Sequence, residues 1–316
     1  MTHDGKSYLR FVQLQSNDVQ RRHCCFSVHC RRNRRMRIYF FCILMLINNI
    51  GHAQHQSSLV DALLFHASFD GSADADLAKG DARIYTAQSL KREDVQAGLH
   101  SSAVSLNRTQ GRYGGSLSFT KKSDQIVFFK GDGNLPQTMQ DFHGTYSFWL
   151  RLTPEEDLPP GYVDPLQITD KKWNDASFFV DFTKEVPRKF RLGVFSDYKF
   201  WNPQDLKWDD IPDRERPLVT VDKPPFSREK WTYVGITFRE FNGENQESVA
   251  SLYLNGISQG DVRRKQRFTW SKDRLAIMLG INYVGQFDDF AIFDRALTAA
   301  EMKQVFQLPK GIKSLR

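Results

Sequence analysis

The sequence predicts an all-β protein, an antiparallel sandwich with one short helix near its C-terminal end. Short apolar runs recur between turn residues, and almost no helical pattern separates them. Several runs alternate, so that Tyr146, Phe148 and Leu150 share one face of an expected strand. Regular strands without crossover helices indicate antiparallel pairing rather than a parallel sheet.

The expected strands follow one another along most of the chain. Each is a short run rich in apolar and aromatic residues, bounded by Gly, Pro, Asn, Asp or Ser. Leu254 is followed by Asn255-Gly256, a strong hairpin signal, so Ile257 should begin a return strand. The other strands are expected at Ala62–Phe69, Ser116–Phe119, Gln125–Phe129, Thr145–Leu152, Ser177–Phe182, Phe190–Phe195, Pro217–Val221, Trp231–Phe238, Ala250–Leu254, Leu275–Leu279 and Phe287–Phe293.

One helix is well marked near the C-terminal end. Thr298 and Glu301 have the spacing of a capping box, apolar residues at helical spacing follow them, and Pro309 ends the pattern. Two long stretches, Thr153–Asp175 and Asp197–Arg216, are rich in Pro, Asp and Trp and are expected to be loops. Loops of this length in a compact domain are more often functional than idle.

The basic charge of the chain belongs to its first 53 residues. The whole chain has 44 basic and 37 acidic residues, a net charge of +7, and nine of the basic and two of the acidic residues precede residue 54. The remaining 263 residues therefore carry no net charge, which excludes a basic globular nucleic-acid binder. All four cysteines also lie in the first 53 residues, so the body has no disulfide framework, thiolate nucleophile or cysteine metal site.

The leader divides at Met36. Residues 1–35 are interpreted as an over-extended or disordered leader, with translation beginning at Met36. Residues 36–53 are interpreted as a signal peptide, because a basic residue precedes an apolar run and small residues stand at Gly51 and Ala53. The apolar run is shorter than the ~20 residues of a transmembrane helix, although an uncleaved anchor is the alternative. The expected location is secreted, periplasmic or at the cell surface.

Five segments carry a family resemblance. The sequence GQFDDFAIFDRALTAAE at 285–301 resembles the last strand and following helix of LamG-like jelly-roll domains, in the concanavalin A-like lectin/glucanase superfamily. Four earlier segments fit the same family in order, at 64–71 (LFHASFDG), 112–119 (RYGGSLSF), 145–152 and 231–238.

The resemblance implies a two-sheet antiparallel jelly-roll sandwich with an exposed concave face. It predicts a LamG-like domain over 60–308, followed by a C-terminal tail at 309–316. The fold hosts lectins, hydrolases and adhesion modules, so it does not by itself determine function.

Asp70 and Asp288 are the candidate metal ligands. Asp70 ends the first expected strand and Asp288 lies at the start of the last, and related domains hold calcium at such a rim. Carboxylates that converge with backbone carbonyls suit Ca²⁺, so the resemblance implies a structural calcium ion. The alternative is that Asp70 caps a turn and Asp288 accepts hydrogen bonds from backbone amides.

No catalytic residue is predicted. The glucanase branch of the superfamily carries Glu-x-Asp-x-Glu on one strand, which places its carboxylates on one face, and no expected strand has this pattern. Asp181 stands alone in its strand and would be the first candidate if the protein were a glycoside-active enzyme with atypical carboxylates.

Three tryptophans are the candidate carbohydrate-binding residues. Trp173, Trp201 and Trp208 lie in the two expected loops among polar residues, where an exposed indole can stack on a sugar ring. The alternative is that each indole packs beneath its loop. A basic run at 263–267 is interpreted either as a solvated strand edge or as a contact for sulfated or uronic polysaccharide.

The sequence thus predicts an exported, non-catalytic module that binds carbohydrate or a cell-surface partner, with a structural calcium ion as an optional component. The alternatives are the glycoside-active enzyme and a structural adhesion domain that binds protein. The expected partners are a polysaccharide, a cell-surface glycan or an extracellular protein. Nucleic acid is not expected, and a membrane only through an uncleaved signal.

Overall fold

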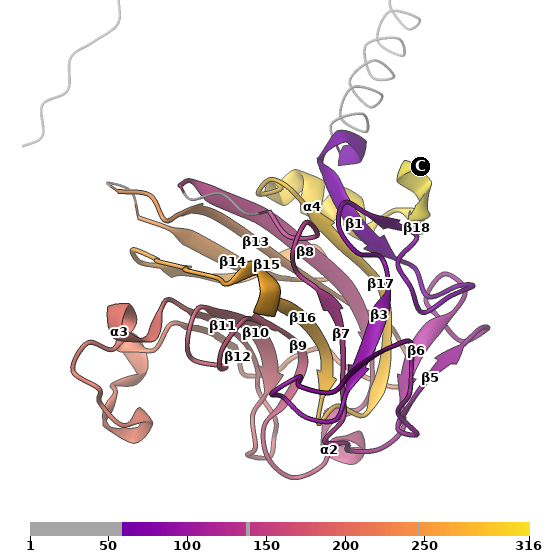
Figure 1. The fold of residues 1–316 in the computed structure, drawn as a ribbon, viewed down its shortest axis with the longest axis horizontal. Coiled ribbons are helices and arrows are strands. Elements are labelled where there is room, and N and C mark those ends of the chain that lie inside the picture. The colour runs from indigo at the N-terminus through magenta and orange to yellow at the C-terminus, as the bar shows by residue number, and fades with distance from the viewer. Residues whose placement is uncertain (1–58, 137–139, 245–246) are drawn as a thin grey trace, which may run out of the picture. The chain divides into compact units, whose positions relative to one another are not determined.

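The computed structural model describes residues 59–136, 140–244 and 247–316, which form two antiparallel β-sheets (Figure 1). The leader interpretations for 1–35 and 36–53 lie outside the described residues. Within the described part of the chain, no helix is long and apolar enough to cross a membrane.

The first sheet, called sheet A, has nine strands. Its order is β15-β14-β13-β8-β17-β1-β2, and β6 pairs with both β17 and β5. The strands are β1 (Leu63–Ala67), β2 (Leu77–Ala78), β5 (Val104–Asn107), β6 (Ser116–Phe119), β8 (Phe142–Arg151), β13 (Thr232–Phe241), β14 (Val249–Leu254), β15 (Ile257–Arg263) and β17 (Gly285–Phe293).

The second sheet, called sheet B, has eight strands in the order β12-β11-β10-β9-β16-β7-β3-β4. The strands are β3 (Ile84–Ala87), β4 (Val95–Ala97), β7 (Ile126–Lys130), β9 (Val163–Thr169), β10 (Ser177–Phe182), β11 (Phe190–Phe195), β12 (Leu218–Val221) and β16 (Ala276–Ile281). The predicted all-β sandwich is therefore confirmed.

The predicted C-terminal helix is α4 (Ala299–Phe306), and Thr298 and Glu301 form both hydrogen bonds of its capping box. Two further helices, α2 (Pro154–Asp157) and α3 (Tyr198–Trp201), are single turns. They lie in the loops before β9 and after β11 and are too short for the sequence pattern to reveal.

The segment at 309–316 is packed against the body. It forms β18 (Pro309–Ile312) and a 3-10 turn, and Ile312 and Leu315 are buried in an apolar cluster with Trp149 and Met302. Sheet A thus has its own small apolar layer beneath α4 and the chain end.

The main core lies between the two sheets and is rich in Phe. Phe178 of β10 packs against Tyr146 and Phe238 of sheet A, with ring centroids 5.7 and 4.8 Å apart. Strand alternation turns Phe178 inward and its neighbours Phe179 and Asp181 toward the outer face of sheet B.

Most expected strands are present, with ends shifted by three residues or fewer. The prediction of a loop over Thr153–Asp175 is wrong for β9, which pairs with β10 and β16 near the middle of sheet B. Asp164 and Pro165 interrupt the apolar pattern there, and a bulge opposite β10 accommodates them. The strands β3 and β5 were not predicted, because each is a four-residue strand that contains polar residues.

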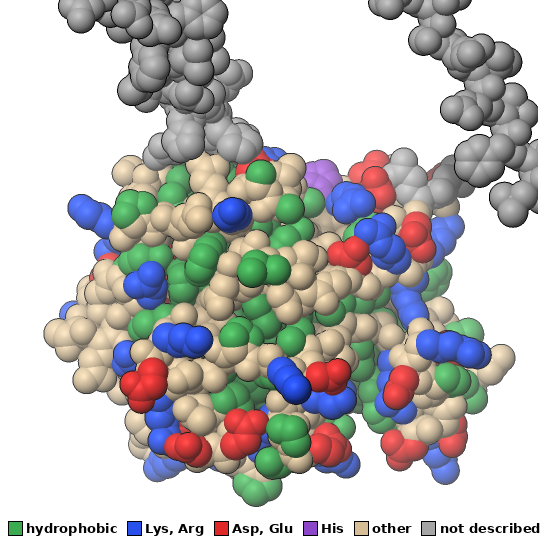
Figure 2. Space-filling view, turned by 180° about the vertical axis from the view of Figure 1, so that it is seen from behind, with side chains coloured by type: hydrophobic (Ala, Val, Ile, Leu, Met, Phe, Trp, Pro, Cys, Tyr) green, Lys and Arg blue, Asp and Glu red, His purple; other side chains and the backbone are tan. Residues whose placement is uncertain are grey.

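Charged side chains are mixed over the surface. On the face shown in Figure 2, basic and acidic side chains are interspersed, as expected for a body without net charge. The loop region around α3 stands off as a separate lobe at the lower right of that view, with a hollow beside it.

Candidate functional site

A row of four side-chain positions crosses the outer face of sheet B. Met278 of β16 is the register partner of Gln167, Gln167 pairs with Phe179, and Phe179 pairs with Gly193. A Cβ atom on Gly193 would lie 2.2 Å from the Phe179 ring, so the ring lies directly on the glycine backbone. The four positions form an apolar floor with one amide.

A second row runs beside the first and carries charge. Ile281 pairs with Asp164, and Asp181 pairs with Arg191 across the next strands. The Arg191 guanidinium binds both carboxylate oxygens of Asp181, with Nε 2.8 Å from Oδ1. Burial and the neighbouring Asp181 charge raise the pKa of the Asp164 carboxyl well above its usual range, against the opposing effect of Arg191.

These rows form the floor of a cavity of about 660 Å³. Trp173 and Trp208 form one wall, with ring centroids 5.5 Å apart in an edge-to-face arrangement. Trp173 is 43% exposed. Tyr162, whose ring lies beneath the Arg191 guanidinium of the charged row, is 41% exposed. An exposed indole therefore stands beside a largely apolar floor, within a cavity that opens to solvent.

Trp201 does not line this cavity. Its indole Nε1 donates a hydrogen bond to the Asn174 carbonyl oxygen at 2.8 Å, and its ring packs on Phe195 at 5.0 Å and on Tyr198 at 5.8 Å. The structure thus brings Trp173 and Trp208 together, while Trp201 joins the loop after β11 to the loop before β10.

Several lining residues were missed in the sequence. Leu90, Arg92 and Arg274 reach the cavity from turns that lie far from the tryptophans in the chain. No local pattern indicates such a meeting, because it depends on the order of the strands. Phe179 could have been identified, since alternation within its strand places it on the same face as Asp181.

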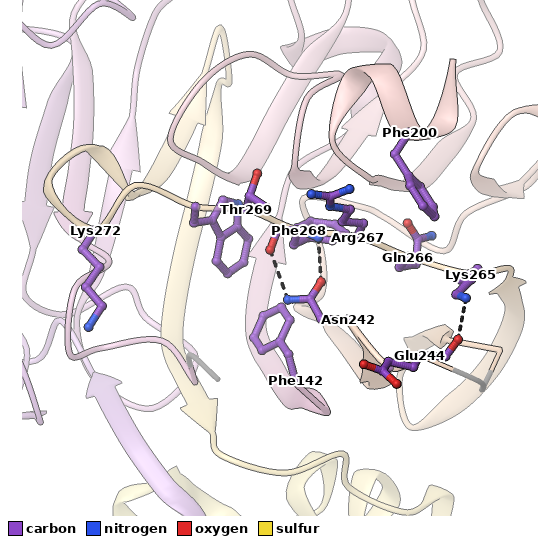
Figure 3. A pocket seen from close by; sticks show the side chains of 12 residues that line it. Phe142, Phe200, Asn242, Glu244, Lys265, Gln266, Arg267, Phe268, Thr269 and Lys272 are labelled. Atoms are coloured by element: carbon purple, nitrogen blue, oxygen red, sulfur yellow. Dashed lines mark hydrogen bonds between the residues drawn. The ribbon is translucent and has the colours of Figure 1, made fainter. Parts of the chain in front are cut away.

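A larger cavity of about 890 Å³ lies near the end of the β13–β14 hairpin (Figure 3). Phe142, Phe200 and Asn242 are among its lining residues. The Asn242 side chain accepts a hydrogen bond from the Phe268 amide at 2.7 Å and donates one to the Phe268 carbonyl at 3.1 Å. Asn242 and Phe268 thus satisfy each other's hydrogen bonds. Lys265 and Arg267 of the basic run line this cavity, whereas Trp173, Trp201, Trp208, Asp70 and Asp288 do not.

Asp70 and Asp288 both hold the loop before β6. Asp70 Oδ1 accepts a hydrogen bond from the Gly115 amide at 2.7 Å, and Oδ2 forms an ion pair with Lys313. Asp288 Oδ2 accepts a hydrogen bond from the Arg112 amide at 2.6 Å. Both carboxylates therefore face N–H and ammonium donors.

In the described part of the chain, the rim at Asp70 and Asp288 lacks the ligand set that Ca²⁺ needs. Among the described residues, no three or more His, Cys, Asp or Glu side chains form a group that could hold a metal. Burial and the neighbouring Asp289 charge raise the pKa of the Asp288 carboxyl to about 8. Calcium requires several oxygen ligands that face the ion, so the arrangement of Asp70, Asp288 and Lys313 does not fit it.

The sequence and the fold were compared with known proteins. A family model described as the concanavalin A-like lectin/glucanases superfamily matches residues 122–303. No curated protein matches the sequence.

Three of the solved structures that are similar in fold illustrate the range of ligands. Domain 4 of AbnA, an extracellular arabinanase from Geobacillus stearothermophilus in complex with arabinotriose, has a TM-score of 0.50 and 14% identity, covering 78% of this chain and 98% of that one. The botulinum neurotoxin serotype D ligand-binding domain in complex with N-acetylneuraminic acid has a TM-score of 0.51 and 14% identity, covering 80% and 53%. The botulinum neurotoxin DC binding domain in complex with rat synaptotagmin II has a TM-score of 0.50 and 14% identity, covering 82% and 52%.

The chain thus spans about half the length of the toxin binding domains and nearly all of the arabinanase domain. At this identity, the likenesses show a shared fold.

Proposed function

The chain belongs to the concanavalin A-like lectin/glucanase superfamily, and from that premise we propose that it is a carbohydrate-binding module. The ligand would bind on the outer face of sheet B. One observation carries the proposal: the half-exposed Trp173 ring stands beside an apolar floor in a cavity of about 660 Å³. This volume lies in the range of about 300–1,000 Å³ that is usual for small-molecule sites.

The chemistry of the cavity suits a sugar. A pyranose offers an apolar ring face, which an indole covers, and hydroxyl groups at its edges. Gln167, Asp164 and Asn282 supply polar groups around the floor. The solved arabinanase domain and the serotype D toxin domain, whose structures contain arabinotriose and N-acetylneuraminic acid, support this ligand class.

The proposal includes export. The apolar run after Arg37 and the small residues Gly51 and Ala53 support a signal peptide over 36–53. The module would then act as a secreted, periplasmic or cell-surface protein, with a polysaccharide or a surface glycan as its ligand.

The proposed role is binding without catalysis. Asp181 is the carboxylate that a glycoside-active enzyme would use first, but both of its oxygens bind Arg191. The guanidinium charge stabilises the carboxylate and so weakens it as a nucleophile or general base. Release of reducing sugar by the wild type, and not by Asp181→Asn, would instead establish the enzyme.

The binding test compares two aromatic residues of similar exposure. Trp173→Ala should lower affinity for a saccharide found by glycan array at least about tenfold in calorimetry, because loss of one stacked ring removes roughly 1.5 kcal/mol. Phe200→Ala, at 40% exposure against 43% for Trp173, lies in the larger cavity and should leave affinity unchanged.

The reverse result, in which only Phe200→Ala lowers affinity, would move the site to the larger cavity. If no saccharide binds and Trp173→Ala abolishes binding to an extracellular protein, the module is a protein-binding adhesion domain. The solved complex of the DC toxin domain with synaptotagmin II makes that outcome a specific alternative.

A further inference from the structure

The cavity on sheet B has an excess of positive charge. Its lining includes two acidic residues and six basic ones, namely Asp164 and Asp181 with Lys91, Arg92, Lys171, Lys172, Arg191 and Arg274. Two of the six are neutralised within the protein: Arg191 by Asp181, and Lys171 by carboxylates 3.5 and 3.7 Å away. Among the described residues, the other four form no ion pair.

Among these four residues, Arg92 has an unusual backbone conformation and a guanidinium placed over the cavity floor. It is a non-glycine residue with a φ of 53°, in the left-handed region that costs free energy for most side chains. Its guanidinium lies 3.3 Å from the Met278 sulfur and donates to the Arg274 carbonyl at 2.9 Å, so it is held over the floor by neutral acceptors. Burial and the Arg274 charge lower its pKa, which a bound anion would reverse.

The acidic members of the cavity do little to offset this charge. Asp181 is already paired with Arg191. Asp164 is a single carboxyl among four cations that form no ion pair, so it does not balance their charge. The unpaired charge in the cavity is therefore positive. The planar guanidinium of arginine can donate two parallel hydrogen bonds to a carboxylate or a sulfate.

We propose that the cavity binds an anionic saccharide, with Arg92 and Arg274 holding its acidic group and Trp173 covering a sugar ring. This inference rests on the proposed carbohydrate-binding function and names its ligand class. The shared chemistry is an acidic group on a sugar, supplied either by a uronate or by a sulfate ester.

The basic run at 263–267 is a weaker candidate for the same role. Arg263 forms an ion pair with Asp261, Arg264 donates to the Glu215 carbonyl, and Arg267 lies 3.7 Å from Asp197. Arg263 and Arg267 thus lie against carboxylates that offset their charge, whereas Arg92 and Arg274 have no ion-pair partner among the described residues.

The test compares an acidic ligand with its uncharged ester and adds a sulfated ligand as the second source of acidic groups. The full-length protein is titrated calorimetrically with an oligogalacturonate, with its methyl ester and with a sulfated neutral oligosaccharide. We expect the uronate or the sulfate to bind at least about tenfold more tightly than the ester. Its affinity should fall as salt rises from about 50 to 500 mM, since screening shortens the reach of the four cations.

Variants then locate the charge. Arg92→Gln and Arg274→Gln should each weaken the acidic ligand about tenfold or more and leave the methyl ester unchanged, whereas Trp173→Ala should weaken both. Arg263→Gln removes the same charge from β15 and should change neither affinity.

Two results would overturn the inference while leaving the proposed function intact. One is that neither the uronate nor the sulfated oligosaccharide binds more tightly than the methyl ester. The other is loss of acidic-ligand binding in Arg263→Gln alone, which would assign the anion to the basic run. If no saccharide of any charge binds, the proposed function itself fails. Circular dichroism confirms that each variant is folded before it is scored.

Discussion

Trp173 and Trp201 show how one residue type takes two roles in neighbouring loops. The Trp201 indole N–H is satisfied by a backbone carbonyl and its ring packs on Phe195. Trp173 packs edge-on against Trp208 and keeps nearly half of its surface exposed. Exposure and hydrogen bonding, rather than residue type, therefore distinguish Trp201, which joins two loops, from Trp173, whose exposed ring we propose as part of the ligand surface.

Trp201→Ala should destabilise the protein by about 2 kcal/mol, because it removes a part-buried hydrogen bond and the ring packing on Phe195. Any loss of saccharide affinity would then be indirect. Trp201→Phe keeps the ring and should cost about 1 kcal/mol, with affinity unchanged. Urea unfolding and calorimetry measure both effects. A stable Trp201→Ala protein that no longer binds saccharide would place Trp201 in the binding surface.

The ion pair between Asp70 and Lys313 leads us to expect that calcium does not change the thermal stability of the protein. Lys313 already supplies a positive charge to Asp70. We therefore expect Tm in EDTA and in millimolar Ca²⁺ to agree within about 1 °C. A rise of several degrees in the wild type would show that the ion displaces Lys313 and that the calcium prediction is correct.

At the scale of elements, the strands differ in how much the sequence reveals. β10 and β11 are continuous runs of apolar residues on one face, and their predicted ranges agree with the structure. β9 contains Asp164 and Pro165, so its local sequence resembles a loop. It is a strand because β10 and β16 pair with it from both sides, a non-local contribution that no sequence window contains.

The capping box of α4 should make the stability of the protein depend on pH through the Glu301 carboxylate. Hydrogen bonds from Arg295 and from the Thr298 cap lower the pKa of Glu301 to about 2, from 4.5. The unfolded chain binds this proton first as pH falls, so the stabilisation is present above about pH 4.5 and is lost toward pH 2. Glu301→Gln should cost about 2 kcal/mol at pH 7.

Urea unfolding at pH 7 and at pH 3 measures this effect. The difference between wild type and Glu301→Gln should shrink at the lower pH, while Lys303→Gln, in the same helix, should show a small and constant difference. An equal cost of Glu301→Gln at both values would mean that packing, rather than ionisation, accounts for it.

At the scale of the whole molecule, one core joins the two sheets. Phe178 of sheet B contacts Tyr146, Phe238 and Phe241 of sheet A. Because the inner face of each sheet is buried against the other in this main core, we expect the two sheets to unfold together.

Phe178→Ala should lower the free energy of unfolding by about 3–5 kcal/mol, since it opens a cavity between the sheets. Tryptophan fluorescence and far-UV circular dichroism should report the same single transition. Phe200→Ala, on the exposed face of α3, should change stability by less than about 1 kcal/mol. Two separate transitions would show that the sheets are independent.

The sequence by itself determined the fold class, most strands, the capped helix and the neutral, cysteine-free body. These properties follow from local periodicity, turn residues and composition, all of which are read within short windows. It also identified Trp173, Trp201 and Trp208 as candidates, and Asp70 and Asp288 as a pair at one rim.

Only the tertiary structure decided which of these residues meet. Strand order places Trp173 and Trp208 over one cavity with Arg92 and Arg274, and it directs Trp201 into a loop contact. It also sets Lys313 against Asp70, where calcium had been expected. The physical reason is that a binding site depends on contacts between distant segments, and the pairing of strands in two sheets, not any local pattern, establishes those contacts.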